Sequence, residues 1–257
     1  MDLVSIIIPV YNTTFFREAF NSAYNQSYKK KEIIIIYDNN KKEDFEKINK
    51  IILKKKNIRL INNKKNLGAG IARNIGIKYA KGAFLAFLDS DDKWNKDKLK
   101  IQIKFMKDYK LNFTHTSYNI IDEKNKLIGE QIAKKILTYN NLLDSCDIGL
   151  STVVVKKKII LNNSFSNLKT KEDYVLWLKL SKKNQIIGIQ KNLCNWRKSS
   201  NSLSSSVFRK IFDAYQVYYK KENLNFFVSI FRVFILSYNY LFKRIRQKNI
   251  SDVVAPY

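Results

Sequence analysis

Closely spaced carboxylates mark the part of this sequence best suited to chemistry on a phosphorylated substrate. Asp89, Asp91 and Asp92 directly follow the apolar run 83–88. Carboxylates with this spacing at the end of a strand can converge on one Mg²⁺ or Mn²⁺ ion, which takes the rest of its oxygen ligands from water and phosphate. Such an ion can bridge a diphosphate and neutralise the charge of a leaving group. The competing interpretation is that these acidic residues cap the next helix.

Glu172 and Asp173 form a second acidic pair further along the chain. A carboxylate within hydrogen-bond reach of a hydroxyl can take its proton, and partial burial beside Trp177 would raise the pKa of that carboxyl and make it a better base. The segment 170–173 also fits a capping box in which Thr170 is the N-cap of a helix. The roles of catalytic base and of helix cap both stay open at this point.

Alternating segments place these polar residues on a predicted α/β fold. Buried strands are expected over 3–10, 32–37, 58–61 and 83–88, and helices over 15–26, 44–56 and 68–79. This alternation predicts a doubly wound parallel sheet, whose ligands bind beyond the carboxyl ends of the strands. Asn12, Asp38 and the segment 89–92 all follow such ends. Further along we expect helices over 98–110 and 170–182 and strands over 113–121 and 151–155.

The composition is that of a folded domain of enzyme size with a basic surface. Hydrophobic residues make up 45% of the 257 residues, and the net charge is +26. Such a charge attracts nucleic acid, anionic lipid and phosphorylated substrates, although a genome-wide bias towards Lys, Asn and Ile would also produce it. Cys146 and Cys194 are far apart and lack CxxC spacing, so a reduced, cytosolic setting is expected. The N-terminus lacks the pattern of a secretory signal.

The C-terminal part, 207–250, is expected to be helical, aromatic and basic. Within 224–243 the polar residues are three, four or seven apart and trace one narrow stripe: Asn225, Ser229, Arg232, Asn239 and Lys243. Such a helix, followed by the basic residues Lys243, Arg244, Arg246 and Lys248, can lie in an anionic membrane surface. The alternative is that it packs on the rest of the protein or on a second copy. The serine-rich segment 199–206 would be a mobile loop or a hinge before this tail.

Four segments resemble glycosyltransferase family 2, whose members have the GT-A fold. They are 5–12 (SIIIPVYN), 66–76 (NLGAGIARNIG), 84–94 (FLAFLDSDDKW) and the acidic segment 171–177 (KEDYVLW). Their order and spacing are more specific than any single segment. The glycines at 68 and 70 do not fit a dinucleotide fingerprint, because Arg73 stands at its third position. The resemblance implies a doubly wound, mostly parallel GT-A sheet flanked by helices, with a C-terminal helical extension.

The resemblance also implies an activity and a set of site residues. The expected enzyme is a metal-dependent, inverting glycosyltransferase that moves a sugar from a nucleotide diphosphate, UDP first, to a hydroxyl of a glycan or lipid-linked acceptor of the cell surface. Mn²⁺ or Mg²⁺ would bind Asp91 and Asp89, and Asp173 would be the catalytic base, with Glu172 as second choice. The residues expected to bind the nucleotide are Pro9, Tyr11, Asn12, Asp38, Arg73, Asp89 and Ser90.

We expect a nucleotide-sugar-binding half over 1–110, an acceptor-binding and catalytic-base half of the same domain over 111–205, and a helical tail over 206–257. The enzyme would lie peripherally at the inner face of the cytoplasmic membrane. Where the family often has the turn Asp-Asp-Gly-Ser, this sequence has Tyr-Asp-Asn-Asn at 37–40. The identity of the nucleobase therefore stays open, and so does the alternative that the chain is a degenerate family member that acts as a scaffold. A nucleic-acid-binding protein would explain the charge but not the ordered acidic motifs, so no specific nucleic-acid partner is expected.

Overall fold

The apolar runs near the N-terminus form the parallel part of one sheet in this computed structural model, which describes residues 1–199 and 207–253. β1 (Val4–Val10) is buried at every position and pairs in parallel with β2 (Lys31–Tyr37) and β4 (Phe84–Phe87). β3 (Ile58–Asn62) joins β2, also in parallel. Strands covered on both faces have no polar side to present, which explains their continuous apolar sequences.

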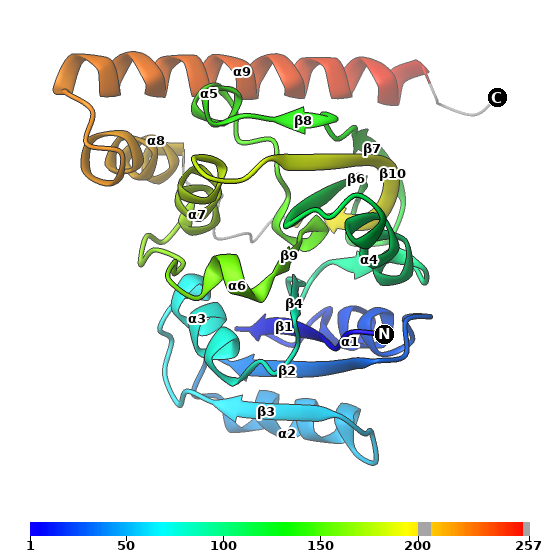
Figure 1. Ribbon diagram of the computed structural model, residues 1–257. Coiled ribbons are helices and arrows are strands. Elements are labelled where there is room, and N and C mark those ends of the chain that lie inside the picture. Colours follow the sequence, from blue (N-terminus) through cyan, green and yellow to red (C-terminus); the bar gives the residue numbers. More distant parts are fainter. Residues whose placement is uncertain (200–206, 254–257) are drawn as a thin grey trace.

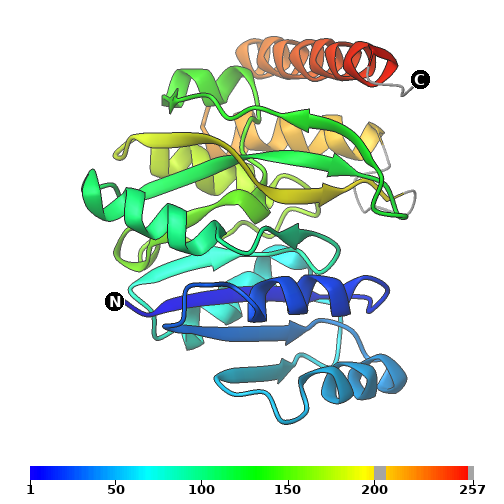
Figure 2. The same cartoon turned by 90° about the vertical axis from the view of Figure 1, so that its right-hand side faces the viewer.

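Helices cover both faces of these strands, as the alternating pattern predicted. α1 (Phe16–Tyr24) and α4 (Lys98–Asp108) share one core with Ile6 and Ile8 of β1, whereas α3 (Ala69–Tyr79) shares the other core with Ile7. α2 (Lys42–Ile52) ends four residues before its predicted limit, because Lys54 already has a positive φ of 61°. The expected α/β fold with parallel strands is confirmed (Figures 1 and 2).

Beyond β4 the sheet continues through antiparallel neighbours. β9 (Val154–Lys156) lies antiparallel between β4 and β6 (Phe113–Ile121). The long strand β10 (Ile186–Arg197), which the sequence did not predict, runs parallel to β6. Three short strands pair with them in antiparallel fashion: β5 (Lys93–Trp94), β7 (Leu127–Gln131) and β8 (Ile136–Leu137). The strand predicted over 151–155 is wrong at its start, where Leu150–Thr152 forms a 3-10 turn.

The second half carries three further helices: α5 (Tyr139–Asp144), α6 (Lys157–Ile160) and α7 (Glu172–Ser181). The capping box proposed for α7 is wrong. The N-cap is Lys171, which has a left-handed φ of 63° and makes no side-chain cap. The Thr170 hydroxyl is already engaged, since it donates to Asp213.

The tail packs on the second half of the molecule. It consists of α8 (Val207–Gln216), a π turn (Val217–Lys221) and α9 (Phe226–Val253), which lies across α5 and along the upper edge in both views (Figures 1 and 2). Within 1–199 and 207–253, no helix has the length and hydropathy of a membrane span. The proposed loop or hinge at 199–206 lies outside the described residues from position 200 onward.

Candidate active site

The carboxyl ends of the parallel strands meet at one edge of the sheet, where the predicted nucleotide residues lie. Pro9 is buried inside β1, whereas Tyr11 and Asn12 just beyond it are exposed. Asp38 follows β2 and is buried, and its carboxylate accepts hydrogen bonds from Asn63 Nδ2 and the Gly68 amide, both at 2.8 Å. Asp38 therefore shapes the loop that leads into α3.

The acidic turn after β4 separates its carboxylates into two environments. Asp89, Ser90 and Asp91 are partly exposed. Asp92 is 1% exposed, and its carboxylate accepts from the Ser151 hydroxyl and from the Arg197 amide at 2.9 Å. Asp92 therefore fixes the turn from inside, whereas Asp89 and Asp91 keep some exposure to solvent.

Arg73 connects the acidic turn to the second acidic pair. Its guanidinium, 4% exposed, donates to Asp89 Oδ1 at 2.7 Å and to Glu172 Oε1 at 2.6 Å. The helix α3, which carries Arg73, closely approaches α7 and the loop before it. A Cβ added at Gly70 would lie 2.4 Å from the Ser166 carbonyl oxygen and 3.1 Å from Glu172 Cγ. The structure thus brings the segments 89–92 and 172–173 to one site, with Arg73 between two carboxylates.

Arg197 is a site residue that the sequence did not indicate. It lies at the end of β10, is 2% exposed, and donates from Nε to the Asp91 carbonyl oxygen at 2.9 Å and from a terminal nitrogen to Glu18 at 3.1 Å. Its amide also holds Asp92. A single arginine in a mixed polar strand has no local signal, so only the tertiary fold shows that it braces the acidic turn.

The electrostatics of the site distinguish its carboxyl groups. Burial, followed by the neighbouring charge of Glu172, raises the pKa of Asp173 to about 7. Burial and the charge of Asp89 raise the pKa of Asp91 to about 6. Groups with pKa values shifted towards neutrality are typical of catalytic and ligand-binding sites.

The donor set at Asp89 and Asp91 fits a hard divalent cation that is completed by a substrate. Within the described residues, no group of three or more His, Cys, Asp or Glu side chains converges as a ready cage. Mg²⁺ and Mn²⁺ commonly need only one or two carboxylates, since water and phosphate oxygens supply the rest. Besides burial, the charge of Asp89 raises the pKa of Asp91, and a bound cation would relieve that repulsion.

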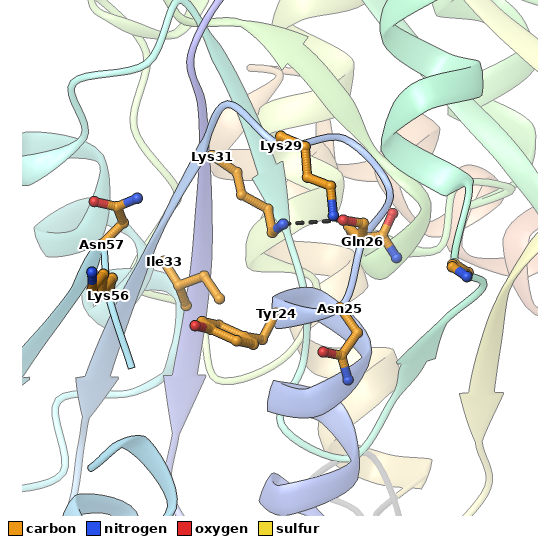
Figure 3. A pocket seen from close by; sticks show the side chains of 9 residues that line it. Tyr24, Asn25, Gln26, Lys29, Lys31, Ile33, Lys56 and Asn57 are labelled. Carbon is orange, nitrogen blue, oxygen red and sulfur yellow. Dashed lines mark hydrogen bonds between the residues drawn. The ribbon is translucent and has the colours of Figure 1, made fainter. Parts of the chain in front are cut away.

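Two other features lie apart from this site. A pocket lined by Lys29, Lys31 and Lys56 opens at the amino ends of β2 and β3, the opposite edge from Asp38, and there the Lys31 ammonium donates to the Gln26 carbonyl oxygen at 3.1 Å (Figure 3). His115 is buried in β6, and burial lowers its pKa to about 4, which suits a neutral structural side chain.

Sequence comparisons associate the chain with a family. A family model described as Glycosyl transferase family 2 matches residues 5–166. The UDP-Glc:alpha-D-GlcNAc-diphosphoundecaprenol beta-1,3-glucosyltransferase WfgD of Escherichia coli is 37% identical over 81% of this chain and 82% of its own length. The putative teichuronic acid biosynthesis glycosyltransferase TuaG of Bacillus subtilis is 32% identical over 87% and 90%, respectively. An uncharacterized glycosyltransferase of Rickettsia felis is 41% identical over 77% of this chain, which spans only 33% of that protein.

Solved structures share the fold. S. aureus TarS in complex with UDP-GlcNAc superposes with a TM-score of 0.68 at 23% identity, over 83% of this chain and 64% of that one. The mannosyltransferase PcManGT from Pyrobaculum calidifontis, in complex with GDP-Man and Mn²⁺, gives 0.67 at 15% identity, over 87% and 65%. The predicted α/β architecture is confirmed by both likenesses.

Proposed function

This chain belongs to glycosyltransferase family 2 and has the GT-A fold, and we propose that it is a metal-dependent, inverting transferase of a sugar from a nucleotide diphosphate. One observation carries the proposal. Arg73 joins the acidic turn after β4 to the acidic pair at the start of α7, at the edge of the sheet where ligands of α/β folds bind. This contact supports the proposal that the donor site and the base lie side by side and share the Arg73 side chain.

The proposed transfer assigns one role to each acidic group. Asp173 takes the proton of the acceptor hydroxyl as its oxygen attacks the anomeric carbon, and the bond from that carbon to the diphosphate oxygen breaks on the opposite face. Asp91, together with Asp89, would hold Mn²⁺ or Mg²⁺, which neutralises the charge of the departing diphosphate when bound. Arg73, whose guanidinium donates to Glu172 and Asp89, is proposed to contribute to binding of the diphosphate.

The donor and acceptor follow from the relatives. UDP is the proposed nucleotide, since a UDP-Glc transferase is among the relatives and TarS binds UDP-GlcNAc in a solved structure. Its uracil and ribose would lie against Tyr11, Asn12 and Asp38 at the ends of β1 and β2, with Ser90 beside the diphosphate. A lipid-linked acceptor of cell-surface glycan synthesis is proposed from the name of WfgD.

Calorimetric titration with UDP, dTDP and GDP, each with and without Mn²⁺, tests this function. At salt high enough to suppress nonspecific attraction to the basic surface, UDP is expected to bind with a Kd of about 1–100 μM and only in the presence of Mn²⁺. Equal binding of all three nucleotides, or none to a folded protein, would contradict the proposal. The second result would indicate a family member without transfer activity.

We also propose that the tail holds the enzyme on an anionic membrane surface, close to lipid-linked acceptors. Part of the polar stripe of α9 faces the protein, where Ser229 is buried and Arg232 pairs with Asp144. The opposite face is apolar and open to solvent, with Phe227 81%, Phe231 62% and Phe234 69% exposed. Exposed contiguous aromatic side chains indicate an interaction surface.

A lipid surface suits this face better than a second copy of the chain. Each chain carries a net charge of +26, so two copies would repel each other, whereas an anionic surface would attract the chain. Four cations, Lys243, Arg244, Arg246 and Lys248, follow in the sequence of α9. The placement of these side chains lies outside the described residues. Each lysine or arginine near an anionic bilayer contributes about 1 kcal/mol of attraction.

Flotation with phosphatidylglycerol vesicles measures this attachment. Replacing Phe227, Phe231 and Phe234 by Ser removes exposed apolar area from α9, so the bound fraction is expected to fall several-fold. Tyr109→Ser is the matched control, since Tyr109 is 65% exposed but lies at the end of α4. Unchanged flotation of the triple variant would contradict the membrane proposal. If the wild type is also a dimer in sedimentation and the triple variant a monomer, the aromatic face of α9 binds a second copy of the chain instead.

A further inference from the structure

The tail contacts α7 from its start to its end. Before the helix begins, Asp213 of α8 accepts from the Thr170 amide at 2.9 Å and from the Thr170 hydroxyl at 2.8 Å. In the first turn of the helix the Tyr174 and Tyr218 hydroxyls lie 3.0 Å apart. Past the C-terminal end, Lys182 pairs with Glu222 at 2.6 Å. Figure 1 shows α8 lying next to α7.

The contact with Thr170 acts on the turn that orients the acidic pair. Lys171, between Thr170 and Glu172, has a left-handed φ of 63°, which is unfavourable for a lysine. The Lys171 side chain makes no cap for the first turn of α7. The conformation of this turn therefore depends on what holds Thr170, and both polar groups of Thr170 that can donate go to Asp213.

Burial strengthens this contact. Asp213 is 2% exposed and Thr170 is also buried. Hydrogen bonds to a carboxylate are stronger than neutral ones, and at a buried site no water replaces a lost donor, so breaking one leaves an acceptor unsatisfied. One carboxylate that takes two donors from the same residue fixes both the backbone and the side chain of that residue.

We propose that Asp213 is a positioning residue for transfer, so that the tail takes part in forming the active site as well as lying at its periphery. Through Thr170 and the left-handed turn at Lys171, Asp213 sets the direction in which Glu172 and Asp173 leave the start of α7. The inference rests on the proposed role of Asp173 as the base. Neither Asp213 nor Thr170 touches the substrate.

A pair of variants at Thr170 separates positioning from simple packing. Thr170→Val keeps the shape and the amide donor but loses the hydroxyl donor, whereas Thr170→Ser keeps both donors. Thr170→Val is expected to lower kcat about tenfold, because small displacements of a catalytic group are costly. The KM for the donor and the calorimetric Kd for UDP should stay within about twofold of wild type, and Thr170→Ser should restore kcat.

Asp213→Asn supplies an independent arm, since an amide oxygen replaces the charged acceptor at the same place. Its kcat should fall with the donor KM unchanged. Wild-type kcat in Thr170→Val, or a parallel loss of kcat and UDP affinity in a folded variant, would overturn the inference. Normal transfer by Asp173→Asn would instead contradict the proposed role of Asp173 as the base. If Asp173→Asn is inactive and Thr170→Val is fully active, only the role of Asp213 is contradicted.

Discussion

Asp173→Asn is expected to abolish sugar transfer while nucleotide binding stays intact. The Asp173 carboxyl lies at the start of α7, and burial raises its pKa to about 7, with the charge of Glu172 adding to the effect. A base with a pKa near the working pH is largely ionised and still binds a proton strongly enough to take it from a hydroxyl. The loss of such a base lowers the rate about 10²–10⁴-fold. Asparagine has almost the same shape and cannot take the proton. Release of nucleotide from the donor, with an acceptor present, measures the loss.

The protonation of Asp173 gives two controls. Transfer by the wild type should rise with pH through about 7, because only the ionised carboxyl is a base. The folded pKa lies above the unfolded value near 3.8, so the wild type loses stability as the pH rises from about 4 to 7. Asp173→Asn removes that loss and should melt no lower than wild type at pH 8. Normal transfer by this variant would move the base elsewhere, with Glu172 as the next candidate.

Sequence patterns predicted the parallel half of the fold because burial there is continuous. Residues 33–37 and 84–88 are buried at every position, so a continuous apolar stretch is enough to predict each strand from one sequence. β10 has no such run, since Ile186–Arg197 mixes Gly, Gln, Lys and Asn with apolar residues. Its pairing with β6 includes register shifts between Ile189 and Cys194. Tertiary pairing determines that strand, and a local pattern could not predict it.

Local spacing located the acidic segments of the site but not the side chains that hold them. The carboxylates at 89–92 and 172–173 are close in sequence within each group, and the structure brings the groups together. Arg197 is 105 residues from Asp92, and Asp213 is 43 residues from Thr170. Contacts of such separation leave no trace in one sequence. The predicted helix cap at Thr170 is wrong for this reason: the Thr170 hydroxyl donates to Asp213, which is far away in the sequence.

The tail shows a different limit of sequence patterns. Periodicity predicts that the polar residues of α9 share one face, but it does not say whether that face meets water or protein. Here Arg232 and Asn239 pair with Asp144, so this part of the stripe packs on the protein, whereas the aromatic side is open. A membrane or partner surface is therefore better supported by the structure than by the helical periodicity.

The backbone of Asp91 is held in place independently of its carboxylate. Arg197 Nε donates to the Asp91 carbonyl oxygen at 2.9 Å, while Ser151 and the Arg197 amide hold Asp92. Removing the carboxylate charge of Asp91 should therefore leave the turn intact. The substitution also removes a charge that burial and the repulsion from Asp89 both disfavour, as the raised pKa of Asp91 indicates, so the variant should not melt below wild type at neutral pH.

Asp91→Asn is accordingly expected to lose Mn²⁺-dependent binding of UDP in a folded protein. A neutral amide is a weaker ligand for a hard cation than a carboxylate, and the loss of metal-bridged phosphate contacts should weaken UDP binding at least about tenfold, or 1.4 kcal/mol. Titration of UDP with and without Mn²⁺ measures both effects. Asp108→Asn removes an equal charge from an exposed pair with Lys104 and should bind UDP normally. Unchanged Mn²⁺ dependence in Asp91→Asn would move the metal to other ligands.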